Sequence, residues 1–179
     1  MDSIEAKLTW RDCDLSLRAK LLLSLAAVIA VAAMIFFFSA QNAEDSSKLS
    51  GVVSDFVLSL AVPGYRDMTP AEQQPYRQQW SLAVRKIAHF SEYALLAVTL
   101  VIFLHYLCPG RGFWFVLLGA WVIATLYACT DEYHQMFVDG RGPAVLDVCI
   151  DSAGALLGAA LTTLFLRARR RRPRLEAAD

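Results

Sequence analysis

The stretch RKIAHFSEYALLAVTLVIFLHYL, residues 85–107, puts a cluster of charged and polar side chains ahead of an apolar run that is long enough to enter a bilayer. The cluster consists of Arg85, Lys86, His89 and Glu92. A charged side chain at the centre of a membrane helix costs roughly 2.5–3.5 kcal/mol on insertion scales. The stretch therefore predicts a membrane protein whose charged groups either satisfy one another or hold a ligand.

Polar side chains gather in the same way around two further apolar runs. Those that follow one run, or precede or open the next, are Asp131, Glu132, His134, Gln135, Arg141, Asp147 and Asp151. Acids at a helix C-terminus and cations near a helix N-terminus both oppose the dipole of their own helix. Groups that are unfavourable for their own helix can stabilise each other. We therefore expect the cations of residues 85–89 to face the acids of residues 131–132 across a helix bundle.

The composition fits a small integral membrane protein with one domain. Of the 179 residues, 56% are hydrophobic, and the mean hydropathy is +0.42. Four apolar runs approach the roughly 20 residues that cross a bilayer core: 21–38, 83–107, 113–129 and 145–166. We predict an all-α bundle of about four transmembrane helices. The first run resembles a secretory signal, but its acidic leader and the absence of a small-residue cleavage site favour an uncleaved anchor.

The distribution of basic residues predicts the domain boundaries and the orientation. Basic side chains lie in the leader 1–20, at Arg111 in a tight turn, and in the arginine run 167–174. With four spans all three fall on one side, which should be cytoplasmic. We expect a leader 1–20, a transmembrane domain 21–166 and a basic tail 167–179, with both termini in the cytoplasm. An arginine run can also bind nucleic acid, but its position directly after a span favours the membrane interpretation, and no nucleic-acid partner is expected.

The segment 39–82 joins the first and second spans and is counted in the transmembrane domain. It should lie on the extracytoplasmic side and be partly helical. Apolar side chains recur at helical spacing between Leu49 and Leu60, which indicates an amphipathic helix lying in the membrane interface. Thr69-Pro-Ala-Glu72 has the pattern of a capping box with proline at the first helical position. It should start a short outer helix that leads into the second span.

The glycines and cysteines allow predictions about helix packing, disulfides and metal sites. Gly154 and Gly158 form a GxxxG pattern, so the last span should pack closely on a neighbour. Four cysteines occur without a CxxC motif, which gives little support to a zinc or thioredoxin-type site. Cys129 and Cys149 lie at helix ends where a disulfide is conceivable. No HxxxH or HExxH spacing occurs, and no metal site or cofactor is expected.

Several motifs in a fixed order resemble the VanZ-like family. They are Phe37-Phe-Ser-Ala-Gln41, Arg85-Lys-x-x-His89-x-x-x-Tyr93, Asp131-Glu-x-x-Gln135-x-Phe137, Gly140-Arg141 and Asp147-Val-x-x-Asp151-x-x-Gly154-x-x-x-Gly158. The resemblance covers about residues 36–164. It implies a small multi-pass protein of the bacterial plasma membrane, and the founding member is associated with low-level resistance to the glycopeptide teicoplanin. Many relatives have Asn where Asp151 stands here.

The residues and the resemblance together define a candidate site on the extracytoplasmic side. As a binding module, it would hold an anionic lipid, a lipid-linked cell-wall precursor or a glycopeptide through Gln41, Arg85, Lys86, Glu92, Tyr93, Gln135, Arg141, Asp147 and Asp151. As an enzyme on a lipid-linked substrate, it would use His89 with Asp131 or Glu132 as acid and base.

Two further interpretations remain. The charged groups can be ion pairs that hold the helices together and bind nothing, although such contacts contribute only about 0.6 kcal/mol each. A transporter or channel is disfavoured because the charges gather at one end and no continuous polar route crosses the bundle. The sequence leaves the oligomeric state open.

Overall fold

A computed structural model describes residues 2–139, 142 and 144–176, with side chains described for 16–42, 50–139, 142 and 144–169. Every regular element in these residues is helical: α1 (Asp2–Ser39), α2 (Ala43–Ala61), the 3-10 turn η1 (Tyr65–Asp67), α3 (Pro70–Leu107), α4 (Phe113–Gln135) and α5 (Val145–Glu176). Arg141, which the sequence placed in the site, lies outside the described residues. The predicted all-α fold is confirmed.

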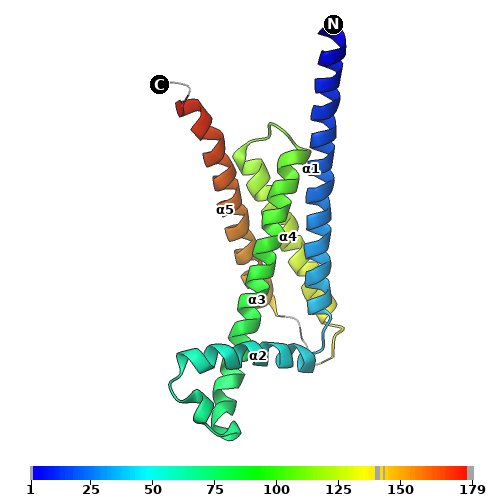
Figure 1. The fold of residues 1–179 in the computed structure, drawn as a ribbon. Coiled ribbons are helices and arrows are strands. Elements are labelled where there is room, and N and C mark those ends of the chain that lie inside the picture. The colour runs from blue at the N-terminus through cyan, green and yellow to red at the C-terminus, as the bar shows by residue number, and fades with distance from the viewer. Residues whose placement is uncertain (1, 140–141, 143, 177–179) are drawn as a thin grey trace.

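Four of the helices are long and apolar enough to cross a membrane: Ser16–Ser39 within α1, then α3, α4 and the part Val145–Arg169 of α5. They run alternately up and down, so both termini and the α3–α4 turn lie at one end of the bundle (Figure 1). We call this the termini end. The opposite end, which we call the α2 end, carries α2, η1 and the α4–α5 connection. The predicted boundaries of the leader and the tail stay predictions. No break in the chain marks them, since α1 continues through residue 20 and α5 continues through residue 167.

Helix α3 is the central element and contacts each of the other four α-helices. Its capping box forms as predicted, since Glu72 accepts hydrogen bonds from the backbone N–H and the hydroxyl of Thr69, both at 2.8 Å. The expected short outer helix does not end before the span. Pro75 lies in its second turn without ending it, and no Pro or Gly occurs from Tyr76 to Leu107, so one helix of 38 residues runs from Pro70 to Leu107. At 1.5 Å per residue it is about 57 Å long, and its first turns extend past α2 (Figure 1).

The closest helix contact joins α3 to α5, and the GxxxG pattern makes it possible. A Cβ atom on Gly154 would overlap the backbone carbonyl of Phe90, and one on Gly158 would overlap that of Ala94. The predicted close packing is therefore confirmed, and its partner is α3. The two helices run parallel, and Ala155 and Ala159 are fully buried beside the glycines. Small buried alanines on α4 (Ala120, Ala124 and Ala128) complete the core.

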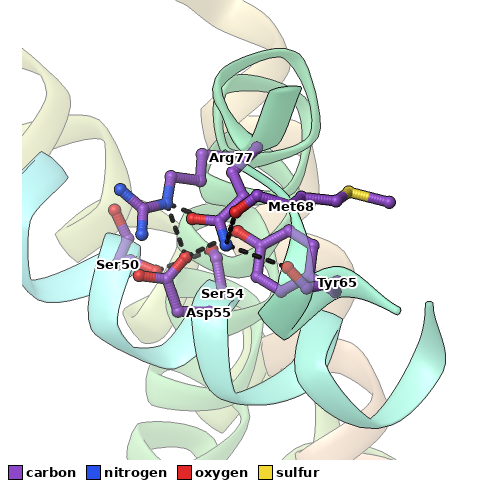
Figure 2. A network of polar contacts seen from close by, with 7 residues as sticks. Ser50, Ser54, Asp55, Tyr65, Met68 and Arg77 are labelled. Carbon is purple, nitrogen blue, oxygen red and sulfur yellow. Dashed lines mark hydrogen bonds and ion pairs between the residues drawn. The ribbon is translucent and has the colours of Figure 1, made fainter. Parts of the chain in front are cut away.

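Helix α2 lies across the end of the bundle and is fastened there by a polar network (Figure 2). Arg77 of α3 donates to Asp55 of α2 at 2.7 Å, and the Tyr65 hydroxyl donates to the same carboxylate at 2.8 Å. Burial raises the pKa of this hydroxyl, which keeps it a donor. Gln73 closes the network by donating to the backbone carbonyls of Tyr65 and Met68. The apolar side chains Val52, Phe56 and Leu60 stay exposed on α2, as an interfacial helix requires.

Replacing Gly158 with alanine should destabilise the bundle, because its new methyl group meets backbone that cannot move aside alone. We expect Gly158→Ala to lower the free energy of unfolding by about 1–3 kcal/mol, measured by denaturation in detergent. Gly51→Ala in α2 is the matched control, since no atom lies within 4 Å of its new Cβ, and it should stabilise by about 0.5–1 kcal/mol. Equal behaviour of the two variants would contradict the close α3–α5 contact.

Candidate functional site

A polar cavity of about 180 Å³ lies at the α2 end between α3, α4 and α5. Arg85, Lys86 and His89 reach it from α3, Gln135 from α4, and Asp147 and Asp151 from α5. Leu82, Ile150 and Gly142 complete the wall. Six of the side chains predicted from the sequence thus line one cavity, although they come from three helices.

Cations and acids of α3 and α5 meet across this cavity. The Lys86 ammonium group lies 3.1 Å from an Asp147 carboxylate oxygen, and both side chains are about two-fifths exposed. The prediction that Lys86 faces the acids of residues 131–132 on α4 is therefore wrong, since its partner is Asp147 on α5. The cause is the glycine contact, which brings α5 closest to α3. With Gly154 level with Phe90, Asp147 lies about one turn before the level of Lys86, within reach of the long lysine side chain. On α3 itself, His89 Nδ1 lies 3.8 Å from a Glu92 carboxylate oxygen.

The acids of α4 have other partners and lie beside the cavity rather than in its wall. Asp131 accepts from the Gln135 amide at 3.2 Å, and the same amide donates to the Ser39 hydroxyl of α1 at 2.8 Å. Glu132 accepts from the backbone N–H of Ala144 in the α4–α5 connection. All three α4 side chains are buried. They fasten α4 to α1 and to the connection, and through Gln135 they reach the cavity.

Three buried polar groups meet where these two sets join. The Tyr93 hydroxyl, which is fully buried, lies near the carboxyl groups of Asp131 and Asp151 but makes no hydrogen bond of normal geometry. One oxygen of Asp131 and one of Asp151 are likewise buried without a hydrogen-bond partner in the described part of the chain. An unsatisfied buried group costs about 1–3 kcal/mol. Such groups are expected where a site is retained for function rather than for stability.

Some sequence-predicted residues lie outside the cavity, and some cavity residues were not predicted. Gln41 follows the end of α1 and is half-buried, and Glu92 and Tyr93 lie beside the wall. Sequence reasoning missed Leu82 and Ile150, whose apolar side chains carry no signal of a site. It also missed Ser39 as the partner of Gln135, although Ser39 stands inside the quoted Phe37–Gln41 motif.

Metal and disulfide chemistry find no support in the described residues. No group of three or more His, Cys, Asp or Glu side chains among them is arranged to hold a metal ion. Cys129 and Cys149 are exposed free thiols. The second histidine of this end, His134, packs against the Phe36 ring at 4.8 Å between ring centroids. The polar side chains that line the cavity are two cations, two carboxyl groups, an amide and an imidazole.

Fold and site define a helical membrane protein with a charged cavity at one end of the bundle. The model of the VanZ/LLP1 family matches residues 24–166, which is most of the chain. The protein belongs to this family. Comparison with curated proteins and with solved structures gave no match.

The burial of Asp151 allows a test of whether the acids form a binding site or serve to hold the helices together by ion pairs. Asp151 is only 4% exposed and has an unpartnered oxygen. Asp151→Asn should keep the shape of the side chain and raise the free energy of unfolding by about 1 kcal/mol, measured by denaturation in detergent. Asp147→Asn is the control and should change stability by less than about 1 kcal/mol, because half-exposed ion pairs contribute little. A clear loss of stability in Asp151→Asn would show that the acids hold the helices together.

Proposed function

We propose that the cavity at the α2 end binds the phosphate-bearing headgroup of an anionic lipid or of a lipid-linked cell-wall precursor. The observation that carries this proposal is the convergence of Arg85 and Lys86 with Asp147 and Asp151 on one cavity. Polar contacts between membrane helices contribute little, so helix association alone does not account for two cations and two carboxyl groups around one cavity. A ligand that uses both signs of charge accounts for the arrangement.

The chemistry of the wall matches a polyol phosphate. An arginine fork and an ammonium group bind phosphate oxygens through charge-assisted hydrogen bonds. The carboxylates of Asp147 and Asp151 can accept from hydroxyl or amino groups of the same headgroup and also hold the cations in place. The exposed side chain of Leu82 at the wall offers an apolar surface for the first carbons of an acyl or prenyl chain.

The size of the cavity selects among the ligands suggested by the sequence. Sites for drug-sized molecules have volumes of roughly 300–1,000 Å³, whereas this cavity has about 180 Å³. This volume supports a group as small as a phosphate headgroup better than a whole glycopeptide. A contribution to teicoplanin-type resistance would then act through the envelope lipid.

The proposed location follows from the distribution of basic residues. Arg111 belongs to the α3–α4 turn and the arginines of α5 to its last part, and both segments lie at the termini end (Figure 1). Cytoplasmic loops carry the excess of Lys and Arg. We place the protein in the bacterial plasma membrane with both termini in the cytoplasm. The cavity at the α2 end then opens toward the outer leaflet, where cell-wall precursors are used.

Removal of the two cations tests the binding function. We expect Arg85→Gln/Lys86→Gln to lower the apparent affinity for phosphatidylglycerol at least about tenfold, measured by native mass spectrometry of purified protein against phosphatidylcholine. Arg66→Gln is the matched control, because Arg66 is an exposed cation at the same end outside the cavity. The proposal fails if the control loses as much affinity, or if neither variant differs from wild type.

An enzyme remains the second candidate, because His89 lines the cavity and has Glu92 beside it. A histidine next to a carboxylate can transfer protons at neutral pH. The acid beside His89 is then Glu92, since Asp131 and Glu132 bond elsewhere.

A catalytic His89 makes a distinct prediction. Purified wild type incubated with a total lipid extract of bacterial membranes should yield new lipid masses, and His89→Gln should reduce their formation by about 10²–10⁴-fold. Its binding of phosphatidylglycerol should change little, which separates catalysis from binding. Equal product in both proteins would remove the catalytic role.

A further inference from the structure

A second cavity, of about 460 Å³, lies at the termini end between α3, α4 and α5. Its wall includes His105 of α3, Arg111 and Gly112 of the α3–α4 turn, Trp114 of α4, and Thr163 and Arg167 of α5. The proposed function makes no use of this cavity. It is separate from the first cavity, because its wall comes from the end of α3, the start of α4 and the last part of α5, and no residue lines both cavities.

Aromatic rings hold the two guanidinium groups of this cavity. The Arg111 guanidinium lies 5.0 Å from the centroid of the Phe115 ring, and that of Arg167 lies 5.4 Å from the centroid of the Phe113 ring. Stacking over a ring face orients a guanidinium and leaves its edge donors available. The positive-inside rule accounts for arginines at this end, but it does not account for two of them being fixed around one cavity.

No acid in the described residues neutralises these cations. The wall contains no Asp or Glu, and none occurs in the neighbouring stretches 16–39, 100–119 and 160–169. The cavity at the α2 end differs in this respect, because its cations face Asp147 and Asp151. A cavity whose described wall carries two arginines and no carboxylate favours an anion from outside the protein.

The start of α4 adds hydrogen-bond donors to the same cavity. Gly112 is the N-cap residue of α4, and no side chain caps this end. The N–H groups of Phe115 and Val116 donate to the Gly112 carbonyl, while those of Phe113 and Trp114 are the first of the helix. A helix N-terminus carries partial positive charge, which favours an anion. Gly112 and Phe113 both belong to the wall, so these donors lie beside the two guanidinium groups.

We propose that this second cavity binds the phosphate group of an anionic phospholipid in the leaflet at the termini end. The phosphate would lie between Arg111, Arg167 and the first turn of α4. The acyl chains would lie along α4, where Trp114, Phe115 and Leu118 are exposed. Basic pockets between transmembrane helices on the cytoplasmic side are suited to lipid headgroups. A soluble phosphate shares the anionic chemistry but gains nothing from this apolar surface.

Two variants that act by different means test the proposal. Arg111→Gln/Arg167→Gln removes the charges. Gly112→Asp adds a carboxylate at the N-cap, where Asp favours the helix and where no atom lies within 4 Å of the new Cβ. Each should lower the apparent affinity of purified protein for phosphatidylglycerol at least about tenfold, measured by native mass spectrometry in the Arg85→Gln/Lys86→Gln background. This background removes the first site, so the two proposals succeed or fail separately.

A control variant distinguishes loss of this cavity from loss of positive charge elsewhere on α5. Arg169→Gln removes an arginine of the same helix that stacks on Phe165 outside the cavity, and it should keep the affinity of the background protein. Gly112→Asp keeps the test decisive if the double glutamine variant does not fold. Equal loss in Arg169→Gln, or full affinity in Gly112→Asp, overturns the proposal. Displacement of phosphatidylglycerol by millimolar glycerol phosphate overturns the assignment to a lipid.

Discussion

The contact between α3 and α5 determines the geometry of the whole chain. Gly154 and Gly158 let the backbone of α5 approach the backbone of α3 at Phe90 and Ala94. No side chain separates the helices there, so the residues one and two turns earlier on α5 face the start of the α3 span. Asp147 thereby reaches Lys86, and Asp151 enters the same cavity. Small residues are how membrane helices achieve such closeness, because lipid provides no hydrophobic force that pushes helices together.

The two ends of the bundle have opposite electrostatic character. At the α2 end, cations and acids from different helices share one cavity, and buried groups around Tyr93 are left without full hydrogen bonding. At the termini end, stacked guanidinium groups surround a cavity whose wall has no acid. The first arrangement suits a ligand with donors and acceptors, and the second suits an anion. The same three helices build both cavities.

Much of the fold followed from patterns along the chain. Apolar runs marked the spans, the Thr69–Glu72 box marked the start of α3, and the GxxxG pattern marked a close contact. The continuity of α3 was not predicted, because an outer helix and a span look like two units when composition changes between them. The pairing of Lys86 was also misjudged. A helical wheel shows which residues share a face, but it does not show which neighbouring helix that face meets.

The sequence by itself determined the class of protein, the spans and the set of charged residues at one end of the bundle, since these depend on local hydropathy and on spacing within each helix. Only the tertiary structure decided which charges meet. It joined Lys86 to Asp147, directed Asp131 and Glu132 to Gln135 and Ala144, and brought Arg111 and Arg167 to one cavity. The reason is that partners on different helices are fixed by how closely the helices approach each other, and that closeness is a property of the packed bundle.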